Sequence, residues 1–326
     1  MFRCFNPALV LAGIILMAFE PSHAKQPVWI DSDPACGFKW NTDVDDCWAI
    51  LFALNTKTID IRGISTVFGN VRGDISYKTL ETLKQQVDTD SINTIYRGAS
   101  DPYEPNSTVV NEASKAIANV LKEKSLTIIA LGPLTNIASL IVDYPESIIN
   151  IKQIIAVAGQ RPDSGGAFFP TKLNIFHMHD INFRKDIAAF KIILASNIPL
   201  KLIPYELAQK VAINTADLDE LSQGINQVKW LADVSRDWLR FWKIAMRRDG
   251  FFPFDSLAVG SLIFSSLFKC EHISAQIETK PSLFVKSRDR LVVSNELGSS
   301  RMVEYCYDVE SEIKYRMMQN FVNIAN

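Results

Sequence analysis

Short apolar runs alternate with segments of helical spacing along most of this chain. The apolar runs have the length of buried strands, and the segments between them repeat their apolar residues at helical intervals. Strands are predicted over residues 27–31, 59–67, 92–97, 126–131 and 154–158. Helices are predicted over residues 43–54, 74–87, 110–124, 134–142 and 186–195. This alternation favours an α/β fold with an open, mostly parallel sheet and helices on both faces.

The remaining third of the chain has a less regular pattern. A helix is predicted over residues 226–248, short β-like runs at 282–285 and 290–293, and a last helix over 309–322. No repeat, low-complexity tract or linker divides the sequence. With 48% apolar and 21% charged residues, the 326-residue chain has the composition of a globular protein. We therefore expect residues 25–326 to form one domain, with inserted helices and a small β-containing C-terminal part.

The N-terminus has the pattern of an export signal. Arg3 precedes an apolar run at residues 8–19, which is too short to span a bilayer, and Ala24 offers a small residue for cleavage. A membrane anchor or a buried strand is the alternative. We predict that residues 1–24 are removed and that the protein is secreted or periplasmic. Four cysteines would remain in the mature chain, an even number that permits disulfides.

The charge balance argues against two classes of partner. The formal net charge is −2, so no global field would attract nucleic acid. The other long apolar stretches are interrupted by charged residues, so no membrane contact is expected once the signal is cleaved. A small molecule is the expected ligand.

Carboxylates gather where the first predicted strand ends and the next helix begins. They are Asp31, Asp33, Asp43, Asp45 and Asp46. Ligands of open α/β sheets bind at the carboxyl ends of the strands. Capping of the helix explains one or two of these residues. A hard cation such as Ca²⁺ or Mg²⁺ explains more, because it takes oxygen ligands and offsets their mutual repulsion.

A phosphatase is an alternative interpretation of the same segment. A strand followed by Asp-x-Asp also begins the haloacid-dehalogenase-like phosphatases, in which one aspartate is the nucleophile. Those enzymes usually place Thr or Val two residues after the second aspartate. Here Asp33 is followed by Pro34 and Ala35.

Five motifs, taken in order, resemble the nucleoside hydrolase family over residues 27 to about 265. Asp31-Ser-Asp33-Pro34 with Asp45-Asp46 is similar to its Asp-x-Asp-Pro-Gly-x-Asp-Asp motif. The others are residues 66–70 (Thr-Val-Phe-Gly-Asn), 132–138 (Gly-Pro-Leu-Thr-Asn-Ile-Ala), 180–189 with Asp180, Asn182 and Asp186, and 254–259 (Phe-Asp-Ser-Leu-Ala-Val). The resemblance implies a Rossmann-like fold and hydrolysis of ribonucleosides to free base and ribose.

The resemblance also implies roles for individual residues. Ca²⁺ would be held by Asp33, Asp46, Asp255 and the main-chain carbonyl of Thr135, and Asp33 would be the general base on a metal-bound water. Ribose hydroxyls would be held by Asp45, Asn174, Asp180, Asn182 and Asp255, with Asn70 lining the same pocket. Relatives are homodimers or homotetramers. These roles agree with the chemistry of the reaction, because carboxylate and amide oxygens around the sugar stabilise an oxocarbenium-like transition state.

Departures from the family pattern affect the expected base site and, at Asp180, the reach to the ribose. Residues 35–44 form a longer link than usual, in which Trp40 either stacks on a base or anchors the loop. Phe254 stands where many members carry the histidine that protonates the leaving base. Phe254 either packs in the core or stacks on the base, which would favour purines. His179, like His177 beside it, is a candidate for the missing acid. Asp180 replaces a longer glutamate. A nucleoside-binding protein without turnover is therefore a second alternative.

Overall fold

A sheet of nine strands organises the described part of the chain. The computed structural model describes residues 25–87, 92, 94–105, 111–162, 180–280, 288–296 and 301–322, so the expected export signal lies outside it. The strands are β1 (Gln26–Ser32), β2 (Ile59–Thr66), β3 (Ile95–Tyr96), β4 (Leu126–Ala130), β5 (Ile151–Ala156), β6 (Leu200–Leu202), β7 (Phe268–Lys280), β8 (Arg288–Val293) and β9 (Arg301–Val309). Their order in the sheet is β3-β2-β1-β4-β5-β6-β9-β7-β8.

The sheet is parallel over most of its width. β1 pairs with β2 and β4, and the parallel pairing continues through β5 and β6 to β9. β7 pairs antiparallel with both β8 and β9 at the other edge. The predicted α/β class with a mostly parallel sheet is thus confirmed, and the C-terminal strands extend that sheet.

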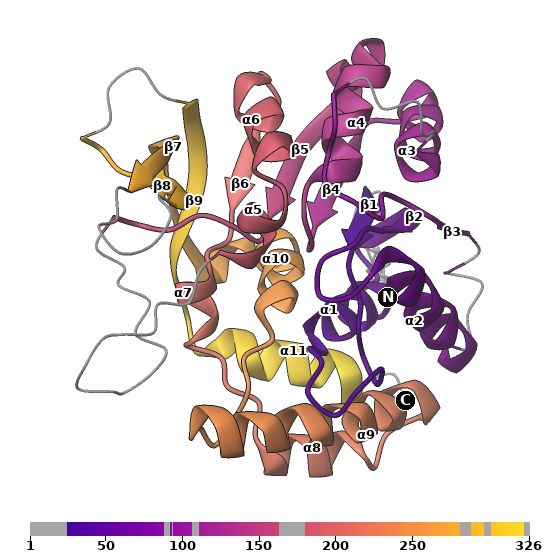
Figure 1. Cartoon of the computed structure of the whole chain (residues 1–326). Helices are drawn as coiled ribbons and strands as arrows, with labels where there is room; N and C mark the ends of the chain where they lie inside the picture. The colour runs from indigo at the N-terminus through magenta and orange to yellow at the C-terminus, as the bar shows by residue number, and fades with distance from the viewer. Residues whose placement is uncertain are drawn as a thin grey trace, which may run out of the picture.

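Helices cover both faces of the sheet (Figure 1). They are α1 (Asp45–Leu54), α2 (Gly73–Gln86), α3 (Glu112–Glu123), α4 (Thr135–Asp143), α5 (Ile181–Lys185), α6 (Ile187–Ala195), α7 (Tyr205–Ala208), α8 (Thr215–Leu221), α9 (Asn226–Phe241), α10 (Phe254–Ile263) and α11 (Glu312–Val322). Successive residues of β1 point to opposite faces. Val28 and Ile30 join a core with α1, α2 and α8–α11, whereas Trp29 joins a second core with α3, α4 and α6.

Several predicted boundaries were wrong. The helix predicted over 43–54 begins at Asp45, and the strand predicted over 92–97 is reduced to Ile95–Tyr96. The helix predicted over 226–248 is regular only to Phe241; a π-helical turn follows to Met246, and Arg247 ends it in the left-handed region at φ 51°. The helix predicted over 309–322 begins at Glu312, because β9 continues to Val309. The predicted run 282–285 lies outside the described residues.

Both cysteine pairs form disulfides, which the sequence permitted without indicating the partners. Cys36 in the 35–44 loop is bonded to Cys47 in α1. Cys270 in β7 is bonded to Cys306 in β9, directly across the antiparallel pair. In the part of the chain that the structure describes, no helix combines the length and apolar character needed to cross a bilayer.

Candidate active site

The acidic residues meet at the carboxyl ends of the central strands. Asp31 lies at the end of β1, and Asp33 follows the strand directly. Because β1 is flanked by β2 and β4 in parallel, the segments that leave all three strands emerge at the same edge of the sheet. α1 begins at this edge with Asp45 and Asp46 in its first turn. α10 packs beside α1, and Asp255 in the first turn of α10 lies near the acidic first turn of α1.

Asn70 joins two of the predicted metal ligands. Its main-chain N–H donates to Asp33 Oδ2 at 2.6 Å, and its Nδ2 donates to Asp46 Oδ2 at 3.1 Å. The main-chain N–H of Asp33 and the hydroxyl of Ser32 both donate to Asp46 Oδ1, at 3.0 and 2.5 Å. Asp33 and Asp46 are therefore fixed in position relative to each other before any ligand binds.

Two glycines let the chain approach the Asp33 carboxylate. A Cβ atom on Gly69 would lie 2.0 Å from Asp33 Oδ2, and one on Gly132 would lie 2.6 Å from Asp33 Oδ1. Gly69 follows β2 and Gly132 follows β4, so the two neighbouring strands enclose Asp33 from either side. The segments that resemble the family's second-strand and Gly-Pro-Leu-Thr-Asn motifs thus both pack on Asp33.

Three carboxylates converge as in a metal site. Oxygens of Asp45, Asp46 and Asp255 all lie within 4.8 Å of one another, and all three residues are buried. Burial raises the pKa of Asp255 well above 3.8, and the charges of Asp46 and Asp33 raise it further. Burial and the charge of Asp46 raise the pKa of Asp33 in the same way. The carboxylates repel one another, and a hard cation bound among them would remove that repulsion.

A cavity beside this cluster collects most of the residues predicted to bind substrate. Its lining residues are Asp43, Asp45, Asn70, Leu131, Val157, Ala158, Asp180, Ile181, Asn182, Tyr205, Phe254 and Asp255. The structure therefore places six of the predicted site residues on one surface: Asp45, Asn70, Asp180, Asn182, Phe254 and Asp255. Their individual roles stay predictions.

Asp180 and Asn182 are held in the cavity wall by main-chain contacts. Asp180 caps α5, because its Oδ1 accepts from Phe183 N at 2.9 Å; its Oδ2 accepts from Gly159 N at 2.7 Å. Burial raises the pKa of Asp180 to about 6, although these two hydrogen bonds oppose the rise. The amide of Asn182 donates to the carbonyls of Leu131 and Val157, which follow β4 and β5.

Thr135 and Asn136 begin α4 just after the turn that packs on Asp33. The hydroxyl of Thr135 donates to Asp186 Oδ2 at 2.6 Å. Asn136 donates to Asp31 Oδ1 at 2.7 Å and to the carbonyl of Thr66 at 3.0 Å. Asn136 thereby links the ends of β1 and β2 to α4, a role that the sequence did not reveal although the residue lies in the matching motif.

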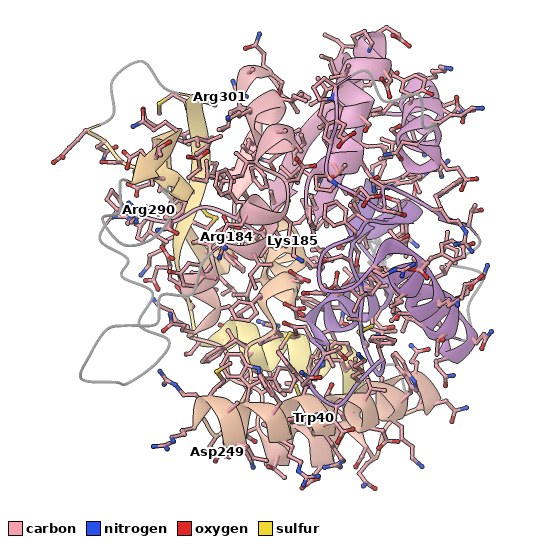
Figure 2. The ribbon with its side chains drawn as sticks, viewed as in Figure 1. Trp40, Arg184, Lys185, Asp249, Arg290 and Arg301 are labelled. Carbon is pink, nitrogen blue, oxygen red and sulfur yellow. A yellow bond between two sulfur atoms is a disulfide. The ribbon has the colours of Figure 1, made fainter. Side chains whose placement is uncertain are left out.

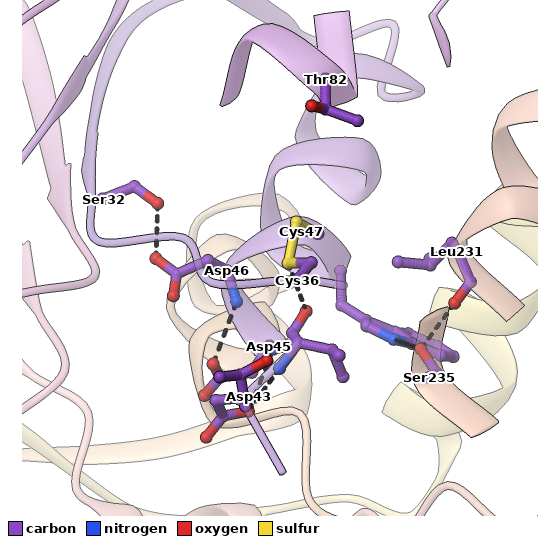
Figure 3. The surroundings of a disulfide bond; sticks show 12 residues. Ser32, Cys36, Asp43, Asp45, Asp46, Cys47, Thr82, Leu231 and Ser235 are labelled. Carbon is purple, nitrogen blue, oxygen red and sulfur yellow. Dashed lines mark hydrogen bonds between the residues drawn. A yellow bond between two sulfur atoms is a disulfide. The ribbon is translucent and has the colours of Figure 1, made fainter. Parts of the chain in front are cut away.

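The 35–44 loop brings Asp43 to the cavity and leaves Trp40 away from it. Figure 3 shows the Cys36–Cys47 disulfide beside Asp43, Asp45 and Asp46. Trp40 instead lies next to α9 (Figure 2), where its ring contacts Phe241 at a centroid distance of 5.8 Å and stays 54% exposed. Trp40 is not among the described lining residues of the cavity.

Two predicted residues are not placed, and six of the twelve described lining residues, Asp43 and Tyr205 among them, were not predicted. Asn174 and His179 lie outside the described residues. Asp43 belongs to the acidic cluster recognised in the sequence but was given no individual role, and its place in that cluster was the available signal. Tyr205 begins α7 with no motif around it, and it reaches the cavity because α7 directly follows β6.

The chain belongs to a known family of hydrolases. The family model of the inosine-uridine preferring nucleoside hydrolases matches residues 28–314, which is most of the chain. The protein is accordingly an enzyme of the class that hydrolyses the N-glycosidic bond of ribonucleosides. The phosphatase alternative, which rested on Asp31 and Asp33 alone, is set aside by this match.

Relatives and solved structures agree with the family. A probable ribonucleoside hydrolase of Dictyostelium discoideum is 24% identical, covering 91% of this chain and 94% of the relative. The non-specific ribonucleoside hydrolase RihC of Salmonella enteritidis is 23% identical, over 77% and 83% of the two chains. The purine-preferring ribonucleoside hydrolase of Gardnerella vaginalis shares the fold, with a TM-score of 0.74, 19% identity and coverage of 92% and 99%. A plant nucleoside hydrolase also shares it, with a TM-score of 0.73, 20% identity and coverage of 91% and 99%.

Proposed function

We propose that this protein is an exported, Ca²⁺-dependent hydrolase that releases the base from ribonucleosides and prefers purines. The convergence of the Asp45, Asp46 and Asp255 oxygens within 4.8 Å, beside the fixed carboxylate of Asp33, carries the proposal. A set of oxygen ligands alone suits a hard cation such as Ca²⁺ better than a metal that prefers nitrogen or sulfur. Asp33, Asp46, Asp255 and the carbonyl of Thr135 would hold it.

Each group of residues in the site has a separate proposed role in the reaction. When bound, Ca²⁺ would acidify a water molecule and orient ribose hydroxyls. Asp33 would accept the proton from that water, and its fixed position suits a general base. Asp45, Asp180 and Asn182 would bind the ribose hydroxyls and stabilise the positive charge that develops on the sugar ring as the bond to the base breaks.

The preference for purines rests on Phe254. Its side chain lines the cavity next to Asp255, so the base of a bound nucleoside would lie close to its ring. An aromatic face stacks more strongly on the larger purine ring than on a pyrimidine. Purine ribosides are therefore expected to have the lower KM.

Export is supported by the cysteines as well as by the N-terminal pattern. The structure pairs Cys36 with Cys47 and Cys270 with Cys306, so each cysteine beyond the expected signal forms a disulfide. Disulfides persist in oxidising compartments. We propose that the mature chain begins after Ala24 and acts outside the cytoplasm, as a homodimer or homotetramer.

The test is release of reducing sugar from a panel of ribonucleosides by the mature protein. Release should stop with a chelator, return with Ca²⁺, and fall by at least about 100-fold in Asp33→Ala, because one positioned acid–base group contributes about 10²–10⁴ in rate. Purines should rank above pyrimidines, and light scattering should give a dimer or tetramer. Retention of a nucleoside with no sugar released would instead support the binding-protein alternative.

A further inference from the structure

The described lining of the cavity combines carboxylates with aromatic rings and contains no basic side chain. Of its described residues, four are aspartates and two are asparagines, with Tyr205 and Phe254 as the aromatic members. None of these lining residues is histidine, lysine or arginine. The described wall therefore has strong acceptors for the sugar and no nitrogen acid for the base.

The composition of the wall affects how the base can leave, because the departing base takes the electron pair of the C1′–N bond. When the C1′–N bond of a neutral purine riboside breaks, the departing ring becomes an anion unless an acid protonates it. Enzymes supply that proton most often from a histidine, whose pKa lies near neutrality. A tyrosine hydroxyl, with an ordinary pKa of about 10, is a weak donor at pH 7.

The charge of the same wall favours a ring that is already positive. Asp43, Asp45 and Asp180 all line the cavity, in addition to the predicted metal ligand Asp255. A divalent cation bound by Asp33, Asp46 and Asp255 would balance only two of their three charges. The faces of Phe254 and Tyr205 would also attract a cationic ring. An anionic group such as a phosphate would be repelled.

We propose that the natural substrate is an N-riboside of a cationic heteroaromatic base, such as a pyridinium or an N-alkylated purinium. This inference rests on the hydrolase function proposed above. The reaction is riboside cation plus water giving ribose, neutral base and one proton. The C1′–N electron pair neutralises the ring, the water oxygen bonds to C1′, and the released proton passes first to Asp33. No acid is required at the base.

Two matched substrate pairs test the proposal with the native enzyme. Guanosine is compared with 7-methylguanosine, and the neutral dihydro form of nicotinamide riboside with its pyridinium form. After subtraction of the uncatalysed rates, kcat/KM should be at least about 100-fold higher for each cation, because a positioned acid, which the described wall does not provide, contributes about that factor to the release of a neutral base. Equal rates within either pair, or a faster neutral member, would overturn the proposal.

Two variants separate the effect of the acid from the effect of charge. Phe254→His adds an acid to the wall, so it should accelerate guanosine hydrolysis and leave 7-methylguanosine much less affected. Asp43→Asn removes one charge, so it should raise KM several-fold for the cations and less for the neutral partners. A Tyr205→Phe variant that loses only guanosine hydrolysis would show that Tyr205 is the acid, and would overturn the proposal.

The outcomes also separate this proposal from the hydrolase function itself. If no riboside of either kind releases sugar while Ca²⁺ still binds, the hydrolase function fails. If neutral ribosides release sugar as fast as the cations, the hydrolase function stands and only the cationic substrate class is excluded.

Discussion

The carboxylate of Asp33 depends on the absence of side chains around it. A Cβ on Gly69 would lie 2.0 Å from Asp33 Oδ2 and 2.8 Å from Asp33 Cγ, with Pro133 Cδ of the neighbouring turn at 2.9 Å. Gly69→Ala should therefore displace Asp33, weaken Ca²⁺ binding by about 10-fold or more, and lower kcat to a similar extent, as loss of a supporting contact does in other metal sites. Calorimetric titration with Ca²⁺ measures the first effect.

Gly260→Ala is the matched control for that substitution. Gly260 lies in the same helix as Asp255, but its added Cβ would meet the tip of Ile313 at 3.2 Å, where a side chain can move. Alanine also suits a helix interior better than glycine. The control should keep its Ca²⁺ affinity. Equal affinities for Gly69→Ala and the native protein would contradict the enclosure of Asp33 as described.

The predictable part of the site followed from residue type and position along the chain. Asp33, Asp46 and Asp255 were expected as metal ligands because they stand in matching motifs. The structure brings oxygens of Asp46 and Asp255 together with those of Asp45, while Asp33 is joined to Asp46 through Asn70. The metal-binding role stays a prediction. The hydrogen bonds from Asn70 to Asp33 and Asp46 were not predictable. They depend on the directions of side chains at the ends of two different strands, which spacing in the sequence does not specify.

The start of α1 is held by a disulfide that includes the residue after Asp46. Cys36 and Cys47 are 11 residues apart, and a cross-link of that span stabilises a protein by about 3 kcal/mol in the chain-entropy account. Replacing both by serine should release the 35–44 loop, lower the melting temperature and weaken Ca²⁺ binding, because Asp45 and Asp46 lose their anchor. Thermal denaturation and Ca²⁺ titration measure the two effects.

The second disulfide provides a control for that double variant. Cys270 and Cys306 join β7 to β9, and neither residue lines the cavity. Their replacement by serine should lower the melting temperature and leave Ca²⁺ affinity unchanged. An equal loss of affinity in both double variants would mean that affinity follows global stability, and it would remove the specific role given to Cys36 and Cys47.

Two of the elements that the sequence failed to predict, α10 and β6, were missed for different physical reasons. α10 is buried on almost all sides, from Phe254 to Ser261, so it has no polar face and no helical period in its pattern. β6 spans only Leu200–Leu202, too short for a strand pattern to stand out. The early central strands were recognised because they are short apolar runs, and α2 and α3 because each combines a buried face with an exposed one. α1 is buried from Asp45 to Ala53, and its acidic first turn was the signal for its start.

The whole molecule concentrates buried acidic groups at one edge of its sheet. The pKa rises from 3.8 to about 7 for Asp31 and to about 6 for Asp46 and Asp180, in each case mainly because burial disfavours the charged form. The folded protein therefore binds these protons more tightly than the unfolded chain. The free energy of unfolding of the metal-free protein should consequently fall as the pH rises from about 4 to about 7.

Calcium should reverse this dependence, since it competes with protons for the same carboxylates. Calorimetry in a chelator should give a lower melting temperature at pH 8 than at pH 5. Calcium at 100 times its Kd should stabilise the protein at pH 8 by about 2.7 kcal/mol, and should have much less effect at pH 5, where the ligands are protonated. Asp255→Asn, which removes one of the converging carboxylates, should reduce both the pH dependence and the calcium effect. A melting temperature at pH 8 that does not respond to calcium would contradict a cation site at this edge of the sheet.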